Sequence, residues 1–170
     1  MLISNEYKAL QVKAHQDRPD WGQAGMANRD QVLAFCKHNG FTSLLDYGSG
    51  KGHLGKSLGE EGIAVTNYDP GMPEYDTRPE PHDFVVCFDV LEHVEPDCIE
   101  AVLDDLKSLI LKAGIFTIST APAKAILSDG SNAHRCIRPK RWWVKRLEER
   151  FGKVQELVEE KASFAVLVQP

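Results

Sequence analysis

This sequence has no long apolar segment, no paired cysteines and no excess of positive charge. No stretch approaches the roughly 20 apolar residues that a membrane-spanning helix needs, and the N-terminal MLISNEYKAL lacks the charged-then-apolar layout of a signal peptide. We therefore expect a cytoplasmic protein that does not enter a membrane.

The four cysteines are scattered along the chain. None forms a C-x-x-C pair, and no histidines follow at the spacing of zinc ligands. We therefore predict no metal site and expect reduced, mostly buried thiols at Cys36, Cys87, Cys98 and Cys136.

Acidic residues outnumber basic ones. The formal net charge of -5, from 25 acidic and 20 basic residues, argues against broad affinity for nucleic acid or acidic membranes, because those partners reward dense positive charge. A chain of 170 residues fits one domain and can bury about 70% of its unfolded surface. We expect residues 1–170 to form one domain.

A glycine-rich segment carries most of the functional information. DYGSGKG, residues 46–52, follows the apolar pair Leu44-Leu45 and precedes a helical pattern that carries Leu54 and Leu58. This order predicts a strand that turns sharply onto a helix. Glycines let the backbone approach a ligand closely, and the free N–H groups of the helix start point into the same space. A nucleotide-like cofactor is the expected ligand.

By pattern alone, this loop suits several ligands. Gly50, Gly52 and Gly55 match the dinucleotide pattern G-x-G-x-x-G, and residues 50–57 also match the phosphate-binding G-x-x-x-x-G-K-[ST]. A surface turn with a helix cap is a further alternative.

The surroundings of the loop favour a cationic nucleoside. Both phosphate-type patterns expect the strand to end at their first glycine, whereas Gly48 and Ser49 intervene here. Asp46 would repel phosphates but could order the cationic amino end of a ligand. Asp69 ends a second apolar run about 20 residues beyond the loop, where an acid suits ribose hydroxyls.

In these segments the chain resembles the S-adenosylmethionine-dependent methyltransferases of the Rossmann-like class I. LLDYGSGKG looks like their first motif, NYDP like the end of their second strand, and DFVVCFDVLEHVEP, residues 83–96, like their fourth strand and the loop after it. The resemblance implies methyl transfer with S-adenosylmethionine as the cofactor. The cofactor-binding residues that it implies are Asp46, Gly48, Ser49, Gly50, Gly52, Asp69, Pro70, Asp89, Val90 and Leu91.

The fold implied by the resemblance is a Rossmann-like α/β fold. It has a doubly wound, mostly parallel sheet with helices on both faces and an antiparallel hairpin at its C-terminal end. Apolar patterns agree with it. They predict strands over 43–47, 63–68, 84–88, 115–120, 154–159 and 163–168, and helices over 5–15, 29–39, a short stretch closed by Gly62, 96 to near Gly114, and 140–151.

Two finer features are expected within this fold. Asn28 and Gln31 have the spacing of a capping box at the start of a helix. The proline-rich connection after the second strand predicts a shortened third-strand region, which leaves Asp76 as a candidate for the adenine contact.

Two histidines are candidates for a general base. His93 follows the fourth strand and His134 lies in the loop after the fifth, so both are expected to face the crevice at the end of the sheet. The alternative for His93 is that it only orients its loop. The histidines expected to be structural or exposed are His15, His38, His53 and His82.

The expected substrate wall is the polar loop 121–139, and residues 1–40 are expected to form a helical lid. Seven of the 20 lysines and arginines fall between Lys124 and Arg146, which favours a small, anionic methyl acceptor. The cations of the helix after this loop are also consistent with a solvated face. The candidate substrate-binding residues are Arg135, Arg138 and Trp142.

Two other functions compete with methyl transfer. An acid after an apolar run, as at Asp89, also binds magnesium in P-loop enzymes, and with Lys56 and Ser57 it would make a nucleotide phosphotransferase. The second alternative is a non-catalytic module that keeps only the cofactor pocket.

Overall fold

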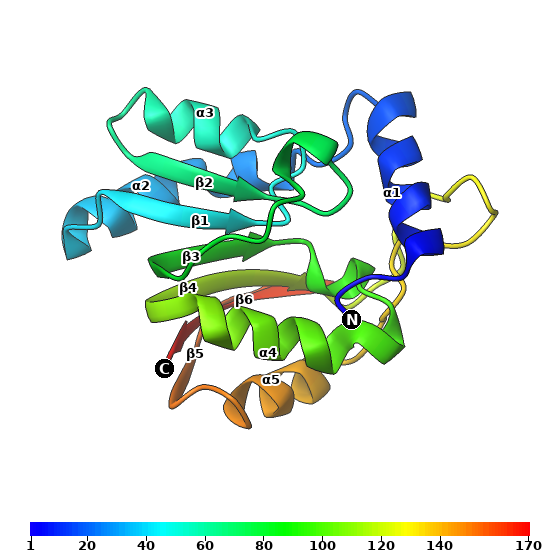
Figure 1. The fold of residues 1–170 in the computed structure, drawn as a ribbon. Helices are drawn as coiled ribbons and strands as arrows, with labels where there is room; N and C mark the ends of the chain where they lie inside the picture. The colour runs from blue at the N-terminus through cyan, green and yellow to red at the C-terminus, as the bar shows by residue number, and fades with distance from the viewer.

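The computed structural model describes residues 1–170 and contains a six-stranded sheet in the order β2-β1-β3-β4-β6-β5 (Figure 1). The strands β2, β1, β3 and β4 are parallel, and β6 and β5 are antiparallel to their neighbours. This arrangement confirms the predicted Rossmann-like sheet with its C-terminal hairpin. The strands are β1 (Ser43–Tyr47), β2 (Ala64–Tyr68), β3 (His82–Phe88), β4 (Ile110–Ser119), β5 (Lys153–Glu159) and β6 (Ser163–Gln169).

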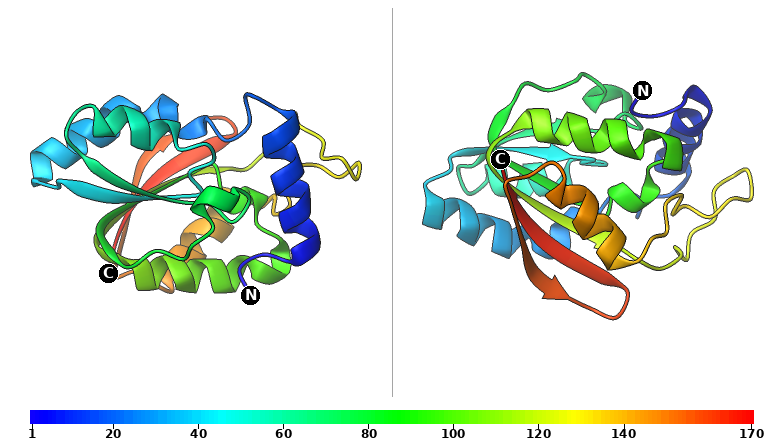
Figure 2. Two further views of the ribbon diagram at one scale, coloured as in Figure 1. Left: turned by 45° about the horizontal axis from the view of Figure 1, so that its top comes forward. Right: turned by 90° about the horizontal axis from the view of Figure 1, so that it is seen from below.

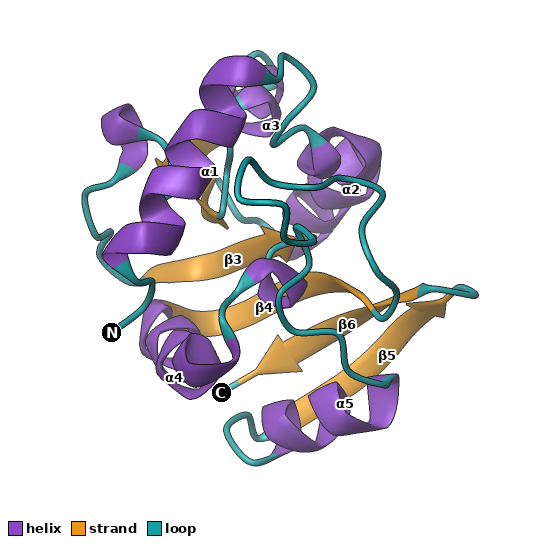
Figure 3. Ribbon diagram, turned by 90° about the vertical axis from the view of Figure 1, so that its right-hand side faces the viewer, coloured by secondary structure: helices purple, strands orange, loops and turns teal.

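Helices cover both faces of this sheet. α2 (Arg29–Asn39) and α3 (His53–Gly59) lie over one face, and α4 (Ile99–Leu109) and α5 (Lys140–Glu148) lie over the other (Figure 1, Figure 2). α1 (Asn5–Asp17) stands across the edge at which the parallel strands end (Figure 3). None of these helices is both long and apolar enough to cross a membrane. The short 3-10 turns are η1 (Ala24–Asn28), η2 (Pro73–Tyr75), η3 (Leu91–His93) and η4 (Pro96–Cys98).

Alternation along β1 explains why both faces are covered. Leu44 and Leu45 are both fully buried, yet they belong to separate clusters, because successive side chains of a strand point to opposite faces. Leu44 shares its cluster with Leu58 of α3, and Leu45 shares its cluster with Leu103 of α4. The sheet is therefore the middle layer of three. A ligand can reach it only at the ends of its strands.

The connection from β2 to β3 contains only the single turn η2. β2 is consequently an outer strand of the sheet, as the proline-rich sequence after it predicts. This shortened region leaves the carboxyl end of β2 open toward α1.

The predicted helix end near Gly114 is wrong. The helix ends at Leu109, and Gly114 lies inside β4, where it pairs with Val85 and Val168. A Cβ at this glycine would lie 2.8 Å from the side chain of Ile110 and 3.0 Å from that of Val168. Close packing within the sheet explains this glycine, and a helix stop does not.

The predicted capping box at Asn28 also does not form. η1 leads directly into α2, so Asn28 has φ -102° and ψ 4° instead of the extended backbone of an N-cap, and its side chain makes no capping hydrogen bond. Gly40 ends α2 in the left-handed conformation with φ 72°, just after the predicted helix over 29–39.

Candidate functional site

A cavity of about 820 Å³ opens at the carboxyl ends of β1, β2 and β3. α1 and the segment after it cover this edge of the sheet (Figure 3). In open α/β sheets a ligand crevice forms where neighbouring strands connect to opposite faces, and here β1 and β3 diverge in this way. Of the residues expected to bind a cofactor, those that line the cavity are Asp46, Gly48, Ser49, Asp69, Pro70, Asp89 and Val90.

The glycine loop is shaped by contacts that leave no room for side chains. Gly48, Gly50 and Gly52 have φ of 80°, 52° and 69°, in the left-handed region that favours glycine. A Cβ at Gly48 would run into the side chain of Val90, closer than real Cβ contacts come. Gly50 and Gly52 do not line the cavity. They turn the chain, and Gly48 and Ser49 line the cavity.

The hydroxyl of Ser49 has no partner in this loop. Ser49 is buried, and its Oγ makes no hydrogen bond to the protein. Because buried hydroxyls are normally hydrogen-bonded and Ser49 lines the cavity, this atom is a candidate contact for a ligand there.

The carboxyl group of Asp46 is buried beside the loop, with only 4% of the residue exposed. Burial, together with the nearby charge of Asp69, raises the pKa of Asp46 to about 7. No protein cation or N–H group offsets this effect. A cationic ligand would do so, because an opposite charge favours the ionised form.

Asp69 is held by the backbone on both sides. Its Oδ2 accepts a hydrogen bond from the N–H of Gly50 and its Oδ1 accepts one from the N–H of Gly71, each at 2.8 Å. Burial raises the pKa of Asp69, against the opposing effects of His15 and of these two N–H groups. A carboxylate has about four acceptor positions, so Asp69 can still accept hydrogen bonds from ligand hydroxyls.

His15 is a site residue that the sequence did not reveal. Its interpretation as merely structural or exposed misses its position, because it is buried, lines the cavity and lies with Nε2 4.0 Å from Asp69 Oδ2. Burial lowers the pKa of His15. Trp21 lines the same cavity, and its ring packs edge to face against His15 and against His93. α1 thereby contributes side chains directly to the site.

The chain after α1 lies on top of the glycine loop. A Cβ at Gly22 would come within 2.8 Å of Gly50 Cα, and Lys51 Nζ donates hydrogen bonds to the carbonyls of Arg18 and Pro19 at 2.8 and 3.1 Å. These contacts with the glycine loop therefore fix the position of the segment after α1, which covers the site.

The end of β3 supplies the third side of the site. Asp89 has φ 53°, which is uncommon outside glycine, and its Oδ1 accepts a hydrogen bond from the hydroxyl of Thr117 at 3.0 Å. Val90 lines the cavity, whereas Leu91 is fully buried in the core next to α4. Leu91 can therefore support the loop but not contact a ligand with its side chain.

The two candidate histidines meet in the cavity. His93 Nδ1 lies 2.9 Å from the carbonyl of Ala133, and His134 Nδ1 lies 2.6 Å from the carbonyl of Ala121. A carbonyl can only accept, so both rings carry their proton on Nδ1 and leave the Nε2 lone pair free. Burial, with a smaller effect of His134, lowers the pKa of His93 to about 4, so this ring is neutral near pH 7.

The three predicted substrate contacts lie outside this cavity. Arg135 stacks over the ring of Tyr7 at 5.5 Å, and Arg138 stacks over Trp142 at 5.7 Å. Trp142 packs against the core below α5, next to the fully buried Trp143. Lys124 is the only lysine or arginine that lines the cavity. The lysines and arginines between residues 124 and 146 are therefore close together in sequence without pointing into the same cavity.

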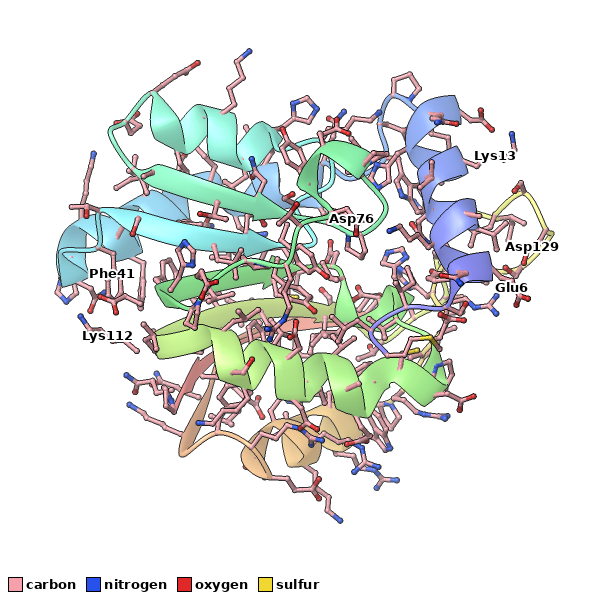
Figure 4. The ribbon with its side chains drawn as sticks, viewed as in Figure 1. Glu6, Lys13, Phe41, Asp76, Lys112 and Asp129 are labelled. Atoms are coloured by element: carbon pink, nitrogen blue, oxygen red, sulfur yellow. The ribbon has the colours of Figure 1, made fainter.

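Asp76, the candidate adenine contact, does not line the cavity either. It forms an ion pair with Lys8 and ties the η2 turn to α1 (Figure 4).

The P-loop alternative does not fit the structure. Lys56 is exposed and outside the cavity, and the Ser57 hydroxyl accepts a hydrogen bond from Arg29 at 3.1 Å on the far side of α3. Neither residue lines the cavity beside the glycine loop.

Comparisons with known proteins identify the family of this chain. The sequence model of a family described as "Methyltransferase domain" matches residues 16–160. Comparison with curated protein sequences gave no match.

Solved structures share the fold at low sequence identity. One is 1,6-didemethyltoxoflavin-N1-methyltransferase of Burkholderia thailandensis with bound 1,6-didemethyltoxoflavin and S-adenosylhomocysteine, with 19% identity, a TM-score of 0.63, and coverage of 99% of this chain and 91% of that one. DhpI in complex with S-adenosylhomocysteine has 19% identity, a TM-score of 0.67 and 98% coverage of both chains. Magnesium protoporphyrin IX methyltransferase of Synechocystis PCC 6803 with bound S-adenosylhomocysteine has 16% identity, a TM-score of 0.61, and coverage of 86% and 84%.

Proposed function

Because this chain belongs to the methyltransferase domain family and is an S-adenosylmethionine-dependent methyltransferase, we propose that it methylates a small molecule bound between α1, η3 and the loop 121–139. The observation that carries this proposal is that one cavity brings together two acids at strand ends, Asp46 and Asp69, and two imidazoles with free lone pairs.

We assign the cofactor to the side of the cavity formed by the strand ends. When bound, S-adenosylmethionine supplies a methyl group on a positively charged sulfur. Asp46 offers its carboxylate to the cationic part of this ligand, Asp69 accepts from the ribose hydroxyls, and Ser49 Oγ gains the partner that the protein does not provide. Gly48 keeps the backbone close to the ligand, and Gly50 and Gly52 hold the turn.

His93 and His134 are assigned to the acceptor side. Each Nε2 can accept a hydrogen bond from an N–H or O–H of the acceptor. Because its pKa is lowered to about 4, His93 is a weak base, so we assign the removal of the acceptor's proton to His134. General base catalysis contributes about 10² to 10⁴ in rate, and positioning contributes roughly 7 to 11 kcal/mol. Holding and orienting the acceptor therefore lowers the activation barrier more than proton removal does.

The cavity does not support the expected negative charge on the acceptor. The predicted anion contacts, Arg135 and Arg138, lie outside it, and Lys124 is exposed. Several acids line the same cavity, which disfavours an anionic acceptor. These acids include Asp46, Asp69, Asp89, Glu92 and Glu95.

We further propose that residues 1–170 act as one domain in which the N-terminal 40 residues cover the site and 121–139 form the acceptor wall. The N–H and hydroxyl of Ser4 both donate to Glu95 at 2.8 Å, and the Tyr7 hydroxyl donates to the carbonyl of Ala133 at 3.3 Å. α1 is thus tied to both the start of η4 and the acceptor wall. The four free, buried cysteines fit a reducing compartment, in line with a cytoplasmic location.

Isothermal titration calorimetry with S-adenosylhomocysteine tests the assigned cofactor site. We expect binding to the wild-type protein, at least tenfold weaker binding to Asp69→Ala, and unchanged binding to the surface control Asp83→Ala, which loses only its ion pair with Lys112. Absence of binding to the folded wild-type protein would contradict the proposal. Equal binding by Asp69→Ala would contradict the role of Asp69.

A further inference from the structure

Glu92 is a buried acid to which the proposed methyl transfer gives no role. It lies in η3 beside His93, is fully buried and borders the cavity. Its main-chain carbonyl accepts hydrogen bonds from the N–H groups of Arg135 and Cys136 at 2.8 and 2.9 Å. The residue is therefore fixed against the acceptor wall.

The two carboxyl oxygens of Glu92 have different surroundings. Oε1 accepts a hydrogen bond from the N–H of Ser119 at 2.8 Å, whereas Oε2 is buried and has no partner. Buried polar atoms are nearly always hydrogen-bonded, because burying one without a partner forfeits its hydration. Because Glu92 borders the cavity, a molecule bound there can supply this partner.

The surroundings of this carboxyl favour its protonated form. Burial, with the nearby charge of Asp89, raises the pKa of Glu92 to about 8. The neighbouring groups bring no compensating cation, because the Cys87 thiol has a pKa raised by burial and the His93 ring is neutral. Lys124, which lines the same cavity, is exposed to solvent. Near neutral pH, the unpartnered oxygen can therefore carry a hydrogen and act as a donor.

The histidines next to it have the opposite character. The Nε2 atoms of His93 and His134 can only accept hydrogen bonds while the rings are neutral, since both rings donate through Nδ1 to carbonyls. A molecule that satisfies the whole acceptor side must therefore offer a hydrogen to an imidazole and a lone pair to an acid.

We propose that Glu92 is an acceptor-binding residue whose Oε2–H donates a hydrogen bond to a carbonyl oxygen or an unprotonated ring nitrogen of the methyl acceptor. The acceptor is then a small, neutral molecule that carries an N–H or O–H beside a carbonyl oxygen or an unprotonated nitrogen. This inference rests on the proposed function, because it places the acceptor in the cavity assigned to it.

The test compares two variants and two probes. In Glu92→Gln the amide oxygen can still accept from Ser119 and the amide N–H₂ can still donate, whereas Glu92→Leu can do neither. The probes are 2-pyridone, which has an N–H beside a carbonyl, and phenol, which has an O–H without that carbonyl. Their dissociation constants are measured by ligand-observed NMR with S-adenosylhomocysteine at saturation.

We expect the wild-type protein and Glu92→Gln to bind 2-pyridone roughly tenfold more tightly than phenol, and Glu92→Leu to lose this preference. A preference kept by Glu92→Leu would overturn the proposal. Loss of the preference in Glu92→Gln would also overturn it, because that result requires an ionised Glu92. Calorimetry with S-adenosylhomocysteine on the same samples separates the two claims, since failure of the proposed function would abolish that binding in the wild-type protein.

Infrared spectroscopy keeps the test independent of whether Glu92→Leu folds. The difference spectrum between wild type and Glu92→Gln isolates the carbonyl band of this carboxylic acid. We expect the band at pH 7 and a shift to lower frequency when 2-pyridone is added. A missing band, or a band that 2-pyridone does not move, would overturn the proposal.

Discussion

The ring of His93 meets the ring of His134 edge to face, with centroids 4.7 Å apart and planes at 87°. Their backbone contacts reinforce this pairing, because His93 donates to the carbonyl of Ala133, the residue before His134. Two segments that are distant in sequence are thereby held as one unit, and each ring has a defined tautomer.

The first prediction concerns these tautomers. Both rings should carry their hydrogen on Nδ1, and His93 should stay neutral until the pH falls to about 4, because its buried ring disfavours charge. Nitrogen-15 NMR of the imidazoles across the pH range measures both properties. An Nε2–H tautomer at either ring, or protonation of His93 near the ordinary histidine value, would contradict the assignment.

The second prediction is that cofactor affinity depends on pH through Asp46. Without ligand, its pKa is raised to about 7, so below that pH the carboxyl must lose a proton before it can pair with the ligand's ammonium. Affinity for S-adenosylhomocysteine should be full above about pH 7 and fall by up to tenfold per pH unit below it.

Calorimetry in two buffers of different ionisation enthalpy checks this, because proton release appears as a buffer-dependent heat. The variant Asp46→Asn should bind more weakly and lose most of the pH dependence. A pH dependence of equal slope in wild type and variant would assign it to another group.

The third prediction uses two glycines in the same region. Gly48→Ala should abolish or strongly weaken cofactor binding, since the new methyl group would collide with Val90 and the backbone φ of 80° disfavours a side chain. Gly59→Ala is the matched control, because a Cβ there meets nothing within 4 Å. In α3 it should leave binding intact and raise the free energy of unfolding by up to about 1 kcal/mol. Calorimetry and chemical denaturation report the two effects.

The fourth prediction concerns the core that supports the site. Leu103→Ala should lower the free energy of unfolding by about 2 to 5 kcal/mol, because this fully buried side chain packs between α4 and the sheet. Leu111→Ala, at a position 56% exposed, should change it by less than about 0.5 kcal/mol. Urea unfolding followed by circular dichroism gives both values, and similar losses for the two variants would contradict the assigned core.

The sheet and its cofactor edge were predictable because they depend on local patterns. Apolar runs such as the one through Leu44 and Leu45 identify strands, and parallel strands end at a common edge, so Asp46 and Asp69 must lie near each other. The methyltransferase prediction is confirmed by the family to which the chain belongs. The roles of individual site residues stay predictions.

The rest depends on packing between distant segments, which has no periodic signature. His15 and Trp21 lie far from the glycine loop in sequence and reach the site only because α1 crosses the end of the sheet. The prediction that Arg135 and Arg138 line the cavity was wrong for a related reason. The number of charges along a segment does not determine the direction of its side chains. Gly114 was misread because a glycine required by strand packing looks like a helix stop.

The contact between Gly22 and Gly50 holds the segment after α1 against the glycine loop at the edge of the cavity. Neither position has space for a side chain, so Gly22→Ala should wedge the cover away from the loop and speed the escape of S-adenosylhomocysteine. Amide hydrogen exchange in α1 would then rise in step with that escape rate. Opening of the N-terminal segment would then set the dissociation rate of S-adenosylhomocysteine.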